Sequence, residues 1–131
     1  MVVALDYGGE RIGVAVTDRA CAHALAHGVV SAKPPERAIT AIQGITSSVG
    51  AERVVIGLPL TLVGAEGTQA AAVRAFGAAL ERVTGLPTEF VDERYTSQEA
   101  ARAAAVKGTP EDAEAARLIL EAWIDRRSSF A

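Results

Sequence analysis

Four acidic side chains stand where predicted secondary structure elements end or begin. Asp6 closes an apolar strand near the start of the chain, Asp92 and Glu93 close a later one, and Asp112 lies in the first turn of a helix. A carboxylate that ends an apolar strand is costly to bury alone, so it either caps a turn or helps to hold a cation. Convergent carboxylate oxygens are ligands that suit Mg²⁺ or Mn²⁺. Two such ions about 4 Å apart could activate a water molecule and stabilise the leaving oxygen in phosphodiester cleavage.

The neighbouring acids Asp92 and Glu93 cannot both join one site while their strand continues. Successive side chains of a strand point to opposite faces, so one acid would share a site with Asp6. The other would pair with Arg94 or with a backbone amide. The residues alone leave both assignments open. Three convergent carboxylates repel one another, which raises at least one pKa unless divalent cations neutralise them.

Asp112 has a structural alternative, because it stands three residues after Thr109 and could complete a capping box at the helix start. Steps of three and four residues from Asp112 lead to the apolar positions Ala116, Ile119, Leu120 and Trp123. Asp112 is therefore predicted on the face that meets the sheet, whereas Glu111, Glu114 and Arg117 are predicted to point elsewhere. This pattern favours a site role over capping alone.

The second predicted strand leaves space beside Asp6. Bulky and small side chains alternate over residues 12–17, so one face carries Ile and Val and the other carries Gly13, Ala15 and Thr17. The two glycines before this strand can adopt the positive φ of a tight hairpin. The nearly bare face gives room for a ligand or another element next to the acid.

Two arginines stand beside the acids. Arg11 follows the hairpin glycines and Arg94 follows Glu93. Guanidinium groups bind phosphate well, so both are candidate nucleic-acid contacts. Surface ion pairs with the acids are the alternative.

Hydrophobic periodicity and the Gly and Pro positions predict the elements that would hold these residues. Strands are predicted at 2–5, 12–16, 24–30, 53–56 and 88–91, and helices at 36–48, 68–84, 97–106 and 109–126. Three strands in a meander, followed by strands alternating with helices, predict an α/β fold. We expect a mixed five-stranded sheet, an antiparallel meander followed by parallel strands, flanked by helices.

The length, amino-acid composition and net charge of the chain limit the classes of protein to which it can belong. The chain has 131 residues, 50% of them hydrophobic, which suits one domain over residues 1–131. Its single cysteine cannot form an internal disulfide, no secretion signal is recognisable, and no apolar run approaches the ~20 residues that cross a bilayer. A cytoplasmic protein without a membrane role is expected. The net charge of −3 argues against a broad basic face, so phosphate contacts would be local or bridged by metal.

Four blocks of the sequence occur in order at the spacing of a known family. They are Asp6–Ala15, Gly57–Leu60 with Gly64 and Glu66, Asp92–Ser97, and Asp112–Ala116. On these blocks the chain resembles the YqgF family, also called RuvX, of the RNase H-like nuclease superfamily. The likeness covers nearly the whole chain.

The resemblance implies an RNase H-like fold and a nuclease site that depends on Mg²⁺ or Mn²⁺. Asp6, Glu93 and Asp112 would be the catalytic and metal-binding residues, with Asp92 as the alternative ligand. Glu93 is preferred because the related resolvases place a glutamate at this strand. The implied role is maturation of small-subunit ribosomal RNA, and the family's older label, Holliday junction resolvase, makes branched DNA the alternative substrate.

Two departures from the family pattern concern the loops near the proposed substrate path. Glu10 stands where a basic residue is usual, and residues 61–64 read Thr-Leu-Val-Gly where the family has an Asn-x-Asp-Gly run. Both changes remove positive charge or polar contacts. They leave the acids intact, so they bear on substrate choice and affinity more than on hydrolysis.

Two other functions compete with a nuclease. The hairpin from Asp6 to Val16 also resembles the phosphate hairpin of actin-like ATPases, although those proteins enclose a nucleotide with two such domains. A non-catalytic ribosome assembly factor that binds RNA is the other alternative. The sequence leaves open whether the protein is a monomer or a homodimer.

Overall fold

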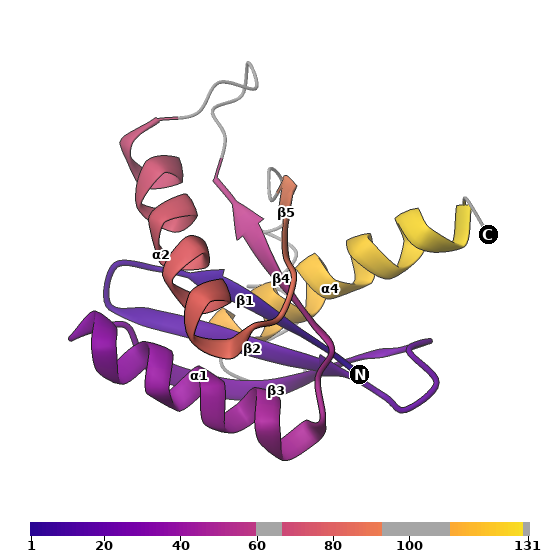
Figure 1. The fold of residues 1–131 in the computed structure, drawn as a ribbon. Coiled ribbons are helices and arrows are strands. Elements are labelled where there is room, and N and C mark those ends of the chain that lie inside the picture. Colours follow the sequence, from indigo (N-terminus) through magenta and orange to yellow (C-terminus); the bar gives the residue numbers. More distant parts are fainter. Residues whose placement is uncertain (60–66, 93–110, 130–131) are drawn as a thin grey trace.

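The computed structural model describes residues 1–59, 67–92 and 111–129 (Figure 1). The strands are β1 Val2–Tyr7, β2 Arg11–Thr17, β3 Ala24–Ser31, β4 Arg53–Leu58 and β5 Thr88–Asp92. The helices are α1 Pro35–Val49, α2 Thr68–Thr84 and α4 Glu111–Ser129. All five predicted strands and three of the predicted helices are confirmed. The predicted helix over 97–106 and most of the loop over 57–67 lie outside the described residues.

The five strands form one mixed sheet in the order β3-β2-β1-β4-β5. β1, β2 and β3 are antiparallel neighbours, whereas β4 lies parallel to β1 and β5 lies parallel to β4. The expected antiparallel meander with added parallel strands is therefore confirmed. Because β1 is central, its carboxyl end lies where the meander and the parallel half of the sheet meet.

Helices cover both faces of the sheet, with α1 and α2 on one face and α4 on the other (Figure 1). The face under α1 and α2 carries large side chains, including Leu5, Ile12, Val14, Val54 and Ile56, which pack in one core cluster with Ile42 of α1 and Leu80 of α2. The face under α4 carries smaller ones at its centre, including Val2, Ala4, Ala15 and Val55, which pack against Ala116, Ile119, Leu120 and Trp123. The predicted apolar stripe of α4 is confirmed. Small residues let this helix lie close to the strands.

Gly8, in the turn between β1 and β2, serves close packing, whereas a Cβ on Gly9 would meet no atom within 4 Å. Gly50 and Gly85 are the glycines with positive φ in the described residues, so the expected positive φ at the hairpin was wrong. A Cβ on Gly8 would lie 2.8 Å from the carbonyl oxygen of Arg11, closer than side chains come to backbone. Only glycine fits here, because the Gly8 amide donates a hydrogen bond to the same carbonyl oxygen and holds the two backbone segments close together.

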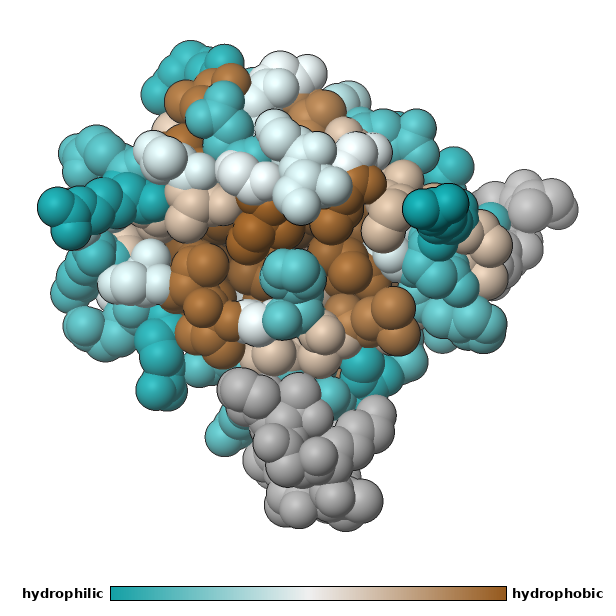
Figure 2. Space-filling view, turned by 90° about the horizontal axis from the view of Figure 1, so that it is seen from below, coloured by the Kyte–Doolittle hydropathy of each residue, from teal (hydrophilic) through white to brown (hydrophobic). Residues whose placement is uncertain are grey.

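The edge strand β3 exposes apolar side chains. Leu25 is 51% exposed and Val29 is 37% exposed. Figure 2, seen from below the view of Figure 1, shows hydrophobic side chains gathered on the side of the molecule where β3 lies.

None of the helices in the described ranges is long and apolar enough to cross a membrane.

Glu114 and Arg117 form a buried ion pair on α4. The Nε atom of Arg117 lies 2.7 Å from Oε2 of Glu114, and their side chains are 14% and 2% exposed. The sequence predicts that both side chains point elsewhere than the face that meets the sheet, but it does not predict their burial. Each charge is balanced by the other one turn away. A second carboxylate, that of Glu121, lies 2.5 Å from Arg117 and is half-exposed.

Removal of this cation is expected to destabilise the fold. Arg117→Met should lower the free energy of unfolding by about 3 kcal/mol, since it leaves the Glu114 carboxylate buried without its cation. Glu121→Gln breaks the exposed half of the same interaction and should cost less than about 1 kcal/mol. Urea unfolding of both variants tests the difference. Equal losses would contradict the buried pair as the stabilising contact.

Candidate active site

Asp6 ends the column of β1 side chains that face α4. Val2 and Ala4 on the same face are buried against that helix, and the strand alternation gives the next position to Asp6. Asp6 pairs with Gly13 of β2, so both positions lie on the same face of the sheet. The acid is partly exposed and sits where the apolar contact with α4 ends.

Gly13 brings the start of α4 next to Asp6. A Cβ built on Gly13 would lie 1.8 Å from the carbonyl oxygen of Asp112 and 3.0 Å from the amide nitrogen of Ala113. The backbone of the first turn of α4 therefore packs directly against Gly13. Any side chain at this position would prevent so close an approach. The start of α4 packs against the bare face that was predicted for β2. Asp6 and Asp112, far apart in sequence, lie at one corner of the fold.

Arg11 contacts Asp112 at this corner. Its Nε atom lies 2.9 Å from Oδ2 of Asp112, and the side chains are 70% and 31% exposed. An ion pair this exposed contributes at most about 1 kcal/mol, so it does not lock the arginine in place. Arg11 can therefore hold the carboxylate or turn toward an incoming anion at little cost.

Asp92 lies on the other face of the sheet. It pairs with Leu58 of β4, which packs in the core under α1 and α2, so its side of the strand is opposite that of Asp6. Glu93 and Arg94 lie outside the described residues. Within residues 1–59, 67–92 and 111–129, no group of three His, Cys, Asp or Glu side chains is arranged to hold a metal ion. The described part of the site thus supplies Asp6 and Asp112.

The family departure at Glu10 is compensated locally. The carboxylate of Glu10 lies 3.0 Å from Nζ of Lys33, with both side chains mostly exposed. This pair reduces the negative charge that Glu10 would otherwise present next to Arg11. The other departure, at 61–64, lies outside the described residues.

The order of the strands, with helices on both faces, defines an RNase H-like α/β fold. The solved structure of Thermus thermophilus RuvC in complex with a Holliday junction substrate has this fold, with a TM-score of 0.63 and 16% sequence identity. That likeness covers 98% of this chain and 98% of the RuvC chain. A second Thermus thermophilus RuvC structure gives a TM-score of 0.60.

The chain belongs to the RuvX family, whose model, described as Holliday junction resolvase, matches residues 1–126. The "Putative pre-16S rRNA nuclease" of Chloroflexus aggregans is 40% identical over 137 aligned residues, covering 98% of this chain and 96% of that protein. A relative of the same name from Anaeromyxobacter sp. strain K is 37% identical, covering 95% of this chain and 96% of that protein. The predicted family membership is confirmed.

Proposed function

We propose that this protein is a metal-dependent nuclease that hydrolyses phosphodiester bonds during maturation of the small-subunit ribosomal RNA precursor. The observation that carries the proposal is the contact of the Asp112 backbone with Gly13, the strand partner of Asp6. The names of the relatives, which refer to pre-16S rRNA, support RNA as the substrate. Such a reaction belongs in the cytoplasm.

The donor set fits a hard divalent cation. Asp6, Glu93 and Asp112 would hold Mg²⁺ or Mn²⁺, with Asp92 as the alternative to Glu93. Carboxylate oxygens are the ligands that these cations take, and the strand alternation that turns Asp92 away from α4 favours Glu93. When bound, the ions would activate a water molecule and stabilise the leaving oxygen.

The chain's own groups prepare the site for a nucleic acid. Gly13 fixes the position of Asp112 by direct backbone contact, so the carboxylates are held by a strand and a helix. Arg11 restrains the Asp112 carboxylate and is exposed enough to contact a substrate phosphate. We assign the same phosphate contact to Arg94.

Removal of divalent metal tests the proposal. RNA carrying the end of a small-subunit precursor should be cleaved in Mn²⁺ or Mg²⁺, and excess EDTA should reduce the rate at least about 10²-fold, since the ions supply several kcal/mol of transition-state stabilisation. Restoring the metal should restore cleavage. Undiminished cleavage in EDTA would contradict the metal-dependent mechanism.

A four-way DNA junction of equal length serves as the competing substrate. The junction is favoured as the alternative because the RuvC chain with the same fold was solved with a Holliday junction. Cleavage of the junction in preference to the RNA would replace the substrate assignment. Tight RNA binding without cleavage in Mn²⁺ would favour a non-catalytic assembly factor.

A further inference from the structure

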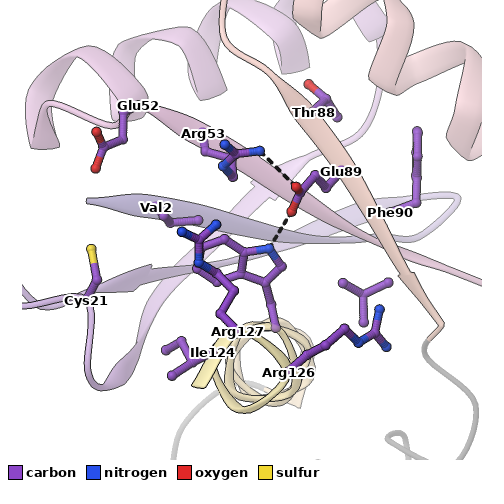
Figure 3. Close-up of a pocket in the computed structure, with 12 residues that line it drawn as sticks. Val2, Cys21, Glu52, Arg53, Thr88, Glu89, Phe90, Ile124, Arg126 and Arg127 are labelled. Atoms are coloured by element: carbon purple, nitrogen blue, oxygen red, sulfur yellow. Dashed lines mark hydrogen bonds and ion pairs between the residues drawn. The ribbon is translucent and has the colours of Figure 1, made fainter. Parts of the chain in front are cut away.

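A hollow of about 1060 Å³ lies at the far end of α4 from Asp112. It opens between the last turns of α4 and the amino-terminal ends of β1, β4 and β5 (Figure 3). We call it the basic pocket, defined by Arg53, Glu89, Trp123, Arg126 and Arg127. None of these residues belongs to the candidate active site.

Two anionic side chains, Glu52 and Glu89, line the hollow, and both are already engaged. Oε1 of Glu52 lies 3.4 Å from the N-terminal ammonium of Met1. Oε1 of Glu89 lies 2.8 Å from Nη1 of Arg53, and the indole N–H of Trp123 donates to Oε2 of Glu89 (Figure 3). Glu89 is therefore held by two donors and forms no ion pair with Arg126 or Arg127. The carboxylate holds Arg53 and the indole in place at the base of the hollow.

The two arginines in the last turn of α4, Arg126 and Arg127, are not paired with an acid of the described residues. The guanidinium of Arg127 lies 4.8 Å from the ring centroid of Trp123, and neither Arg126 nor Arg127 forms an ion pair with the described residues. Both side chains are exposed. Figure 3 shows Arg126 and Arg127 extending on different sides of the end of α4. In a chain of net charge −3, this is a local concentration of positive charge.

Cations near a helix carboxyl end also favour the helix dipole, which alone would explain Arg126 and Arg127. That explanation does not account for the hollow beside them or for Arg53, which approaches it from β4. Cations from a strand and a helix around an open, aromatic-walled hollow are the arrangement that binds phosphates of a nucleic-acid strand.

We propose that the basic pocket binds the phosphate backbone of the same nucleic acid whose scissile bond lies at Asp6 and Asp112, an inference that rests on the proposed function. Trp123 is eleven residues after Asp112, which corresponds to about 16 Å along a helix rising ~1.5 Å per residue. Successive phosphates of a duplex strand are about 3.4 Å apart along its axis, so about five nucleotide steps span this distance. One bound strand can therefore reach both places.

The test uses binding in EDTA, so that its outcome does not depend on cleavage. Trp123 is the only tryptophan of the chain and reports directly on the pocket. A labelled 12-nucleotide single-stranded RNA is titrated by anisotropy, and Trp123 fluorescence is followed with the unlabelled RNA. The Arg126→Gln/Arg127→Gln variant should raise the Kd about tenfold at 0.15 M salt and reduce the salt slope by about 1.4, as expected for two lost phosphate contacts.

A matched control removes two exposed arginines from the other face of the sheet. Arg37→Gln/Arg82→Gln makes the same change in net charge on α1 and α2 and should leave the Kd within twofold. Arg126→Lys/Arg127→Lys keeps the charge and should retain most of the affinity. Far-UV circular dichroism verifies that each variant is folded.

Three results would overturn the proposal. Unchanged RNA affinity in Arg126→Gln/Arg127→Gln would exclude the pocket, even if the protein cleaves RNA normally. An equal loss in Arg37→Gln/Arg82→Gln would make the effect one of net charge. A Trp123 signal with inorganic phosphate or AMP at the same concentrations, with competition against the RNA, would make the pocket a small-anion site.

Discussion

Asp6→Asn is expected to abolish cleavage while leaving the fold intact. Asparagine keeps the shape of the side chain but removes the negative charge that would attract a divalent cation. Loss of one preorganised electrostatic contact typically reduces the rate about 10²–10³-fold. Because Asp6 is partly exposed at the end of β1 and asparagine keeps a side-chain oxygen that can accept hydrogen bonds, the free energy of unfolding should change by no more than about 1 kcal/mol. Single-turnover cleavage and urea unfolding measure the two effects.

Asp18→Asn is the matched control for this substitution. Asp18 follows β2, and its Oδ1 accepts hydrogen bonds from the amides of Ala22 and His23, 2.9 and 3.3 Å away. The pKa of the Asp18 carboxyl lies below its usual value, chiefly because the Ala22 amide donates to the charged form. Its charge serves a turn, so Asp18→Asn should cleave at the parental rate.

Calorimetry separates loss of metal binding from loss of chemistry. Titration with Mn²⁺ should give a heat signal in the parent and in Asp18→Asn, and a strongly weakened signal in Asp6→Asn. Full cleavage by Asp6→Asn would remove this residue from the mechanism. An unchanged Mn²⁺ signal with no cleavage would make Asp6 a catalytic group that does not bind the metal.

Hydrophobic periodicity among neighbouring residues predicted the strands and helices of the described structure and the face of α4 that meets the sheet. Steps of three and four residues from Asp112 identify side chains that are buried, such as Ile119 and Leu120. The alternation along β2 predicted a bare face next to Asp6. These features depend on a few neighbouring residues, so a sequence pattern is enough to find them.

The sequence could not predict features that depend on a partner from another element. The basic pocket combines arginines from β4 and α4 with Glu89 of β5, and no spacing links them in sequence. Gly13 predicted free space beside β2, but the sequence did not predict that the backbone of Asp112 would fill this space.

Gly13→Ala is expected to displace the start of α4 and disrupt both stability and cleavage. The added Cβ would meet the carbonyl oxygen of Asp112 at 1.8 Å, and this backbone atom cannot turn aside as a flexible side chain would. Overpacking of this kind costs about 1–3 kcal/mol, and a backbone contact belongs at the upper end. A shift of about 1 Å at a catalytic group can cost about 10²-fold in rate, so cleavage should fall more than stability predicts.

Gly28→Ala in the neighbouring strand β3 isolates the effect of position. A Cβ on Gly28 meets no atom within 4 Å, so this variant should match the parent in urea unfolding within about 0.5 kcal/mol and cleave normally. A Gly13→Ala protein that is as stable and active as Gly28→Ala would mean that α4 can move without cost, and the close approach would then not position Asp112. Loss of activity with retained stability would instead show that the helix shifts as a body, carrying its carboxylate away from Asp6 while the apolar stripe of α4 stays packed.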